Sequence, residues 1–283
     1  MILRQMKVLK MSSMELIKKL RDTTGSGIVD CKKALSENNN DIEASVKWLR
    51  EKGILKAQKK QDRETNEGVV SFYNNSSNTN FTVCKIKCET DFVAKNNDFK
   101  NFCKEISELN FINKSNIQSL KSSKMKNQKT VDENLIALIS KMGEKITLRR
   151  AKFFENNGLN FSYVHNSLEK NVGKVVSIVQ LSKNSTKDLK DLGSKLAMHI
   201  AAQSPLAIDE SGINKDTLDK ELEIIKAELK NSGKKPEMIE KISSGKIKKF
   251  ISDNTLLNQV WIMDTKKKVN QVVKEYSNGE EIK

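Results

Sequence analysis

Residues 81–106 read FTVCKIKCETDFVAKNNDFKNFCKEI, a strand, a junction and a helix in succession. Phe81 to Glu89 predicts a strand, and Gly68 to Tyr73 before it predicts another. The turn-forming run 74–78 lies between them, so the pair is expected to form a hairpin. After the junction, four apolar residues recur at the i, i+3, i+4, i+7 spacing of one helix face: Phe99, Phe102, Cys103 and Ile106. We expect this face to cover the hairpin.

The same plan recurs further along the chain. Phe161 to His165 and Val172 to Leu181 predict a second hairpin, and Asp188 to Ala202 predicts the helix that covers it. Between the two groups, a capping box opens a helix from Thr130 to Met142, and a strand follows from Ile146 to Phe154. Two strand-turn-strand-helix groups indicate an α+β fold with duplicated core subdomains.

The N-terminal part is predicted to be helical. Residues 14–60 contain three short apolar stripes, the first two separated by the Gly25–Gly27 turn, and Gly53 is expected to end the third helix. Three short helices have a marginal core of their own, so such a module is expected to bind a partner. Residues 1–13 hold three cations and no acid and are expected to be a dispensable extension.

The C-terminal part is predicted to contain a helical hairpin inserted over residues 213–245. Its first helix has a heptad-like seam at Leu218, Leu222, Ile225 and Leu229. The sequence supports equally a structural hairpin and a docking or dimerising arm, which would allow a homodimer or a two-to-two complex with a partner. The polar segment 107–127 is expected to be loop with some helix. The expected segments are an extension (1–13), a helical domain (14–60), two core subdomains (61–155 and 156–262) and a C-terminal module (263–283).

Composition limits the class of protein. The 283 residues are 37% hydrophobic with only 2 Pro and 12 Gly, too apolar for a disordered chain and too poor in Pro and Gly for a fibrous one. No apolar run approaches the roughly 20 residues of a membrane helix, so no membrane partner is expected. The cysteines form no CxxC pair and lie near no histidine in sequence, so no metal site is expected: Cys31, Cys84, Cys88 and Cys103.

The net charge of +15 raises the question of nucleic-acid binding. Only six of the 51 cations are arginine, the residue whose planar fork binds bases and phosphates bidentately. The lysines are spread along the whole chain. We therefore interpret the charge as solvated surface and expect no specific nucleic-acid partner.

Candidates for catalytic chemistry are few. His199 lies in an apolar helical stretch, where a structural histidine is expected, and His165 ends a strand beside Tyr163, where an interface contact is expected. The Gly25–Gly27 turn lacks the remaining residues of a dinucleotide or phosphate loop. We expect no catalytic residue, no cofactor and no bound nucleotide.

The junction Glu89–Asn96 allows two interpretations. Phe92 could be a core plug next to a helix cap at Thr90 or Asp91, or Asp91 and Phe92 could form an exposed wedge on a rigid support. Residue chemistry alone favours the plug.

Several motifs, in order, resemble one family. They are LRDTTGSGIVDCKKAL (20–35), DIEA (41–44) with WLREKG (48–53), CETDFVAKN (88–96), MGEKI (142–146), RR (149–150), YVH (163–165), AMHIAA (197–202) and SGK (232–234). Together they are similar to the translation elongation factor Ts family, from about Met14 to the C-terminus. LLNQVW (256–261) departs from the family's usual Leu-Leu-Glu-Gln-Pro-Phe, and Ser26 and Val29 stand where Ala and Met are frequent, which affects only local packing.

The resemblance implies a guanine-nucleotide exchange factor for elongation factor Tu, in its GDP-bound and nucleotide-free states. It implies that residues 14–60 form a ubiquitin-associated-like domain, and that a wedge enters the partner near its Mg²⁺ site and releases GDP. The implied wedge residues are Thr90, Asp91, Phe92 and Val93. The other implied contacts are Thr24, Gly25, Ile28, Val29, Lys32, Asn96, Tyr163 and His165. The expected compartment is the bacterial cytoplasm, or alternatively a mitochondrial or plastid matrix. A basic, RNA-associated translation protein without exchange activity is the other hypothesis.

Overall fold

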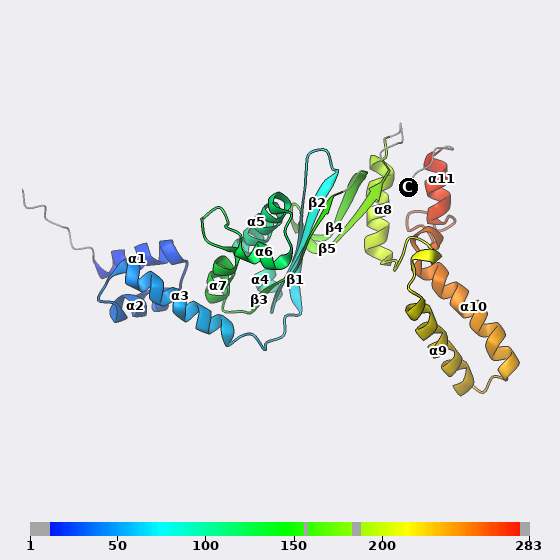
Figure 1. The fold of residues 1–283 in the computed structure, drawn as a ribbon, viewed down its shortest axis with the longest axis horizontal. Helices are drawn as coiled ribbons and strands as arrows, with labels where there is room; N and C mark the ends of the chain where they lie inside the picture. The colour runs from blue at the N-terminus through cyan, green and yellow to red at the C-terminus, as the bar shows by residue number, and fades with distance from the viewer. Residues whose placement is uncertain (1–11, 156–157, 183–187, 278–283) are drawn as a thin grey trace, which may run out of the picture. The chain divides into compact units, whose positions relative to one another are not determined.

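The computed structural model describes residues 12–155, 158–182 and 188–277 (Figure 1). Three helices form the N-terminal part, as the sequence predicts: α1 (Ser13–Thr24), α2 (Ile28–Glu37) and α3 (Ile42–Gln58). We call them the helical module. Their common core is small and consists of Leu20, Cys31, Ala34, Leu35 and Leu49.

Helix α1 begins slightly earlier than its apolar stripe indicates. Ser12 Oγ accepts a hydrogen bond from Glu15 N (3.3 Å), and the Glu15 carboxylate accepts one from Ser12 N (2.8 Å). This capping box satisfies two free N–H groups at the helix start. Ser12 and Ser13, which we expected in the extension, therefore belong to the helix, and the rest of that extension lies outside the described residues.

The expectation that Gly53 ends the third helix is wrong. α3 continues through Gly53 to Gln58, and Gly53 is buried inside it. A glycine that ends a helix usually adopts the left-handed backbone conformation, with a positive φ. In this module Gly25 has that conformation, at φ 68°, and it ends α1.

The strands form one five-stranded sheet in the order β3-β2-β1-β5-β4. They are β1 (Glu67–Asn74), β2 (Asn80–Cys88), β3 (Ile146–Glu155), β4 (Leu159–Glu169) and β5 (Val172–Leu181). β1 and β2 pair antiparallel with Val69 opposite Ile86, and β1 pairs antiparallel with β5 through Val70 and Gly173. The α+β class is confirmed, with both predicted hairpins in a single sheet. An internal duplication stays an interpretation of the sequence pattern.

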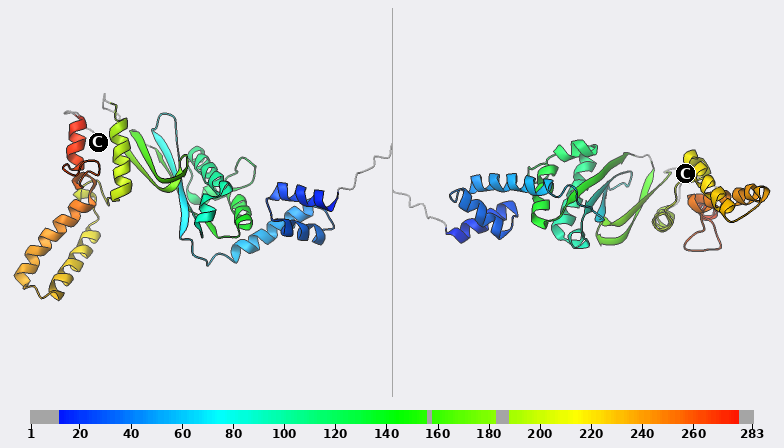
Figure 2. Two further views of the ribbon diagram at one scale, coloured as in Figure 1. Left: turned by 180° about the vertical axis from the view of Figure 1, so that it is seen from behind. Right: turned by 90° about the horizontal axis from the view of Figure 1, so that it is seen from below.

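One face of β1 and β2 is covered by helices. These are α4 (Asp91–Lys95), α5 (Asn97–Asn113), α6 (Ile117–Ser122) and α7 (Val131–Met142). α5 lies along β1 (Figures 1 and 2). Its predicted face, Phe99, Phe102, Cys103 and Ile106, is buried in the first hydrophobic core. Within 107–127 the structure has the end of α5 and then α6, so this segment is more helical than expected.

Helix α7 has the ends that the sequence predicts. Thr130 Oγ1 accepts from Glu133 N (3.1 Å), and a Glu133 oxygen accepts from Thr130 N (2.8 Å). At the other end Gly143 has φ 74° and ends the helix. Both signals depend only on near neighbours in the sequence, which is why they can be recognised without a structure.

Contacts divide the chain into two compact units. Of the described residues, the first comprises those within 1–74, 81–154 and 166–174, and the second those within 75–80, 155–165 and 175–283. The helical module thus belongs to the same unit as the first core. The finer division into five segments stays a prediction.

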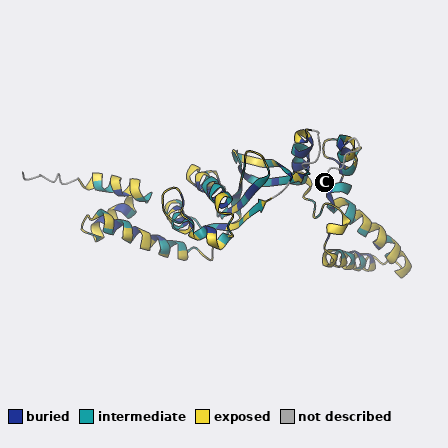
Figure 3. Ribbon diagram, turned by 45° about the horizontal axis from the view of Figure 1, so that its top comes forward, coloured by how far each residue is buried: buried dark blue, intermediate teal, exposed yellow. Residues whose placement is uncertain are grey.

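The second unit has its own core, around α8 (Lys190–Gln203). Leu192 and Leu196 of this helix pack with Leu181, Trp261 and Val269. The predicted hairpin consists of α9 (Lys215–Asn231) and α10 (Pro236–Asn254), so its second helix is longer than expected. The remaining elements are η1 (Glu210–Gly212), η2 (Leu256–Asn258) and α11 (Val269–Ser277). The hairpin helices are mostly exposed, with Ile225, Leu229 and Ser243 buried (Figure 3).

Candidate functional site

The junction between β2 and α4 is held by a carboxylate from another part of the first unit. Glu144, just after α7, accepts hydrogen bonds from Thr90 N (3.0 Å) and Thr90 Oγ1 (2.6 Å). The same Thr90 oxygen accepts from Val93 N (3.4 Å) and caps α4. Thr90 is therefore fixed on both sides. The sequence analysis did not assign a role to Glu144, because its partner lies 54 residues away.

Helix α4 has one buried side and one exposed side. Val93 and Ala94 are buried in the first core, whereas Phe92 is 81% exposed. The core-plug interpretation of Phe92 is therefore wrong. The side chain of Val93 packs into the first hydrophobic core beneath α4, so Val93 is not available for a contact with a partner. An exposed aromatic side chain on a rigid support is typical of protein-binding surfaces.

Asp91 and Asn96 stand at the two ends of α4. The Asp91 carboxylate accepts a hydrogen bond from Lys95 Nζ at 2.7 Å, an i, i+4 pair that the sequence spacing allows. This hydrogen bond lowers the pKa of Asp91, which keeps the carboxylate ionised. Asn96 Oδ1 accepts from Asp98 N (2.9 Å) and caps α5. Its role in this structure is thus local.

The helical module carries a second exposed apolar surface. Val29 is 80% and Ile28 is 56% exposed at the start of α2, and Lys32 one turn later is also exposed. Thr24, the last residue of α1, and Gly25, which follows it, are half-buried; Thr24 Oγ1 donates to Leu20 O at 2.7 Å. Of these five candidates, Ile28, Val29 and Lys32 are available to a partner, and the turn residues position them.

In the second unit, Tyr163 and His165 lie next to each other on β4. The Tyr163 hydroxyl and His165 Nδ1 are 3.2 Å apart, and His165 is exposed. This pair presents a polar, aromatic edge.

His199 is a buried structural residue, as expected. Its Nε2 lies 3.0 Å from Gln259 Oε1, its ring stacks on Trp261 at 5.1 Å, and its Nδ1 has no partner within the described residues. Burial lowers the pKa of His199, which therefore stays neutral near pH 7.

Three buried thiols of the first core are held in the protonated form near pH 7. Burial raises the pKa of Cys84 and Cys88 to about 12, and that of Cys103 well above its ordinary value. Across residues 12–155, 158–182 and 188–277, no three His, Cys, Asp or Glu side chains are grouped so that they could hold a metal ion. In the same part of the chain, no helix is both long and apolar enough to cross a membrane.

These features describe an α+β protein whose exposed apolar side chains are held on rigid supports, the class of a protein-docking factor. The family described as Elongation factor TS matches residues 89–283, and the family described as Elongation factor Ts, mitochondrial, N-terminal matches residues 2–60. The chain belongs to the elongation factor Ts family and so to the elongation machinery of protein biosynthesis.

Three relatives show how far the similarity extends. Elongation factor Ts of Xanthobacter autotrophicus is 41% identical over 92% of this chain and 84% of its own length. The proteins of that name from Nitrobacter hamburgensis and from Methylobacterium sp. are 38% and 39% identical, again over 92% of this chain and 84% of theirs.

Proposed function

We propose that this protein is a guanine-nucleotide exchange factor for elongation factor Tu and that Asp91 and Phe92 are the residues that disturb the partner's Mg²⁺ and phosphate site. Family membership supports the partner and the exchange reaction. The observation that carries the role of the wedge is the 81% exposure of Phe92 on a helix whose other side is buried. GDP then leaves and GTP rebinds.

The support under Phe92 explains how a small surface can act on a partner. Val93 and Ala94 are buried, and Thr90 is clamped by Glu144, so α4 cannot yield when Phe92 presses against another protein. Deformation is therefore expected in the partner. Bound Mg²⁺ is among the largest local charges that hold a diphosphate, so displacing its surroundings weakens the nucleotide.

The reaction needs no catalytic group from this chain. Exchange is a coupling between two binding events, so the factor weakens GDP binding as much as GDP weakens binding of the factor. An excess of GTP then drives the cycle forward. We place Ile28, Val29 and Lys32 of the helical module, and Tyr163 and His165 of the second unit, at further contacts with the same partner. The proposed compartment is the bacterial cytoplasm.

The decisive experiment measures release of fluorescent GDP from the cognate elongation factor Tu by stopped flow. The wild-type chain should accelerate release and should itself bind no GDP. Asp91→Ala should slow release at least roughly tenfold, because a charge-assisted contact is worth about 1.5–3 kcal/mol. Asp98→Ala is the matched control, since Asp98 is another exposed aspartate paired with a lysine at 2.7 Å, and it should not change the rate. No acceleration by the wild-type chain would refute the proposed function.

A further inference from the structure

The helical module contacts the first core through one face of α3. Val46, Leu49, Arg50 and Gly53 recur at i, i+3, i+4 and i+7 and line a cavity of about 150 Å³ between α3 and α7. Further along the same helix, Ala57 packs against the first core. α3 therefore takes part in two cores: that of the module near its start, and that of the sheet near its end.

Helix α7 has a separate face for this contact. Its own core is made by Val131, Leu135, Leu138 and Ile139. Glu133, Ile136 and Ser140 lie on another side and line the same cavity as α3. Their spacing of three and four residues gives a second stripe on one helix. Two opposing stripes at helical spacing indicate a specific helix pair.

Gly53 lies at the contact between the two helices. A Cβ atom at this position would lie 3.4 Å from Ile136 Cγ2 and 3.9 Å from Ser140 Cβ. Both are ordinary van der Waals distances, so alanine would also fit at this position.

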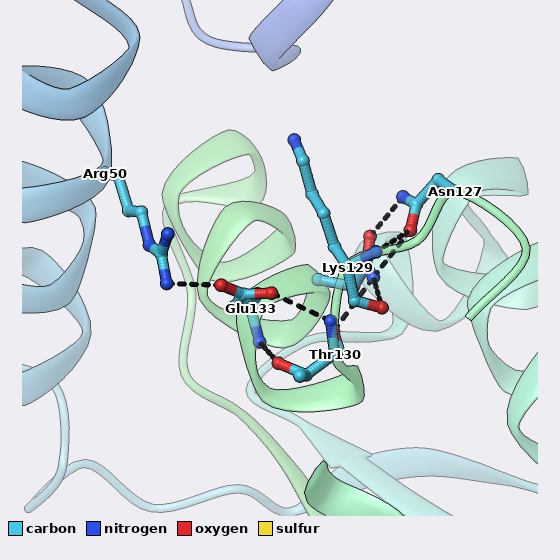
Figure 4. A network of polar contacts seen from close by, with 6 residues as sticks. Arg50, Asn127, Lys129, Thr130 and Glu133 are labelled. Carbon is cyan, nitrogen blue, oxygen red and sulfur yellow. Dashed lines mark hydrogen bonds and ion pairs between the residues drawn. The ribbon is translucent and has the colours of Figure 1, made fainter. Parts of the chain in front are cut away.

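An ion pair closes one end of the contact. One carboxylate oxygen of Glu133 accepts from Thr130 N at 2.8 Å, and the other pairs with Arg50 of α3 (Figure 4). The capping box thus fixes the position of the Glu133 carboxylate with which Arg50 pairs. Because the side chain of Arg50 is 63% exposed, the pair adds little stability.

We propose that the contact between α3 and α7 is a positioning contact: it holds the Ile28–Val29 surface of the helical module at a fixed place relative to Phe92, so that one partner meets both surfaces at once. This inference rests on the proposed function. Two binding surfaces in a fixed relative position bind one partner more tightly than two loosely linked surfaces, because less conformational entropy is lost on binding. The docked module is then the working state of the protein.

A disulfide across the contact tests this directly. The 3.9 Å between a Cβ at position 53 and Ser140 Cβ lies within the usual range for a disulfide, so Gly53→Cys with Ser140→Cys should cross-link under mild oxidation. The four native cysteines are buried, so they should not compete. The cross-linked protein should accelerate GDP release as well as its reduced form. Loss of exchange on oxidation, with recovery on reduction, would show that the module must undock and would overturn the proposal.

A second set of variants opens the contact. Gly53→Asp sets an unpaired carboxylate against Ile136; a charge is used because a larger apolar side chain could fill the adjacent cavity. The concentration of the variant that gives half-maximal GDP release should rise roughly tenfold, as expected when linkage is loosened, with little change in the rate at saturation. Gly53→Ala is the control and should behave as wild type, since its Cβ meets only ordinary contacts.

Rescue separates positioning from misfolding. Ile136→Lys alone should raise the half-maximal concentration as Gly53→Asp does, and the two together should restore it, because the opposite charges can pair across the contact. Hydrogen exchange should show α3 and α7 exposed in each single variant and protected in the pair. Unchanged half-maximal concentrations in variants that hydrogen exchange shows to be undocked would refute the positioning role. A wild-type chain without exchange activity would instead refute the proposed function, while cross-linking would still report the contact.

Discussion

Replacing Phe92 by alanine separates a surface role from a structural one. Phe92 is 81% exposed, so folding buries about a fifth of it. An aromatic side chain offers about 200 Å², so the loss is about 40 Å² or, at about 25 cal/mol per Å², about 1 kcal/mol at most. Alanine also favours helix slightly more than phenylalanine, which reduces this loss. The melting temperature of Phe92→Ala should therefore change little.

Phe99→Ala is the matched comparison in the same unit. Phe99 is fully buried, and truncating a buried phenylalanine costs about 3–5 kcal/mol. Urea unfolding should show this large loss of stability for Phe99→Ala but not for Phe92→Ala. The rate of GDP release per folded molecule should fall for Phe92→Ala but not for Phe99→Ala. If Phe92→Ala lost stability as Phe99→Ala does, while its folded fraction released GDP normally, the wedge would be refuted.

Three further predictions concern other parts of the chain. Removing residues 1–11 keeps Ser12, which caps α1, and should leave unfolding and exchange unchanged; removing Ser12 as well should lower the stability of the module by about 1 kcal/mol. Replacing residues 222–248 by a short loop removes most of the exposed hairpin, and circular dichroism should show that the rest stays folded with part of its exchange activity. His199 is buried and its pKa lies below the ordinary 6.5, so the unfolded state binds the proton more tightly and stability should fall as pH drops below about 6.5. The free energy of unfolding, measured with urea between pH 7.5 and 5.5, should decrease with falling pH by at most the slope that the uptake of about one proton gives. His199→Gln should remove most of this pH dependence.

Local signals in the sequence were sufficient for many elements. The hairpin of β1 and β2, the buried face of α5 and both ends of α7 follow from alternation, helical spacing, a capping box and a C-terminal glycine. Each of these depends on residues a few positions apart. The candidate docking residues came from the resemblance of whole motifs to a family, since the chemistry of Phe92 alone favoured a buried position.

Contacts between distant segments decided the rest. Phe92 is exposed because Val93 and Ala94 occupy the buried side of α4. Thr90 is held by Glu144, which lies 54 residues further along the chain. The spacing of residues in the sequence does not predict either arrangement. Gly53 is a residue type that often ends a helix, yet α3 continues through it and packs against Ile136 of α7, a contact that the sequence pattern does not show. The sequence predicts which faces of the helices and strands are apolar, but only the tertiary structure shows which of these faces pack against each other.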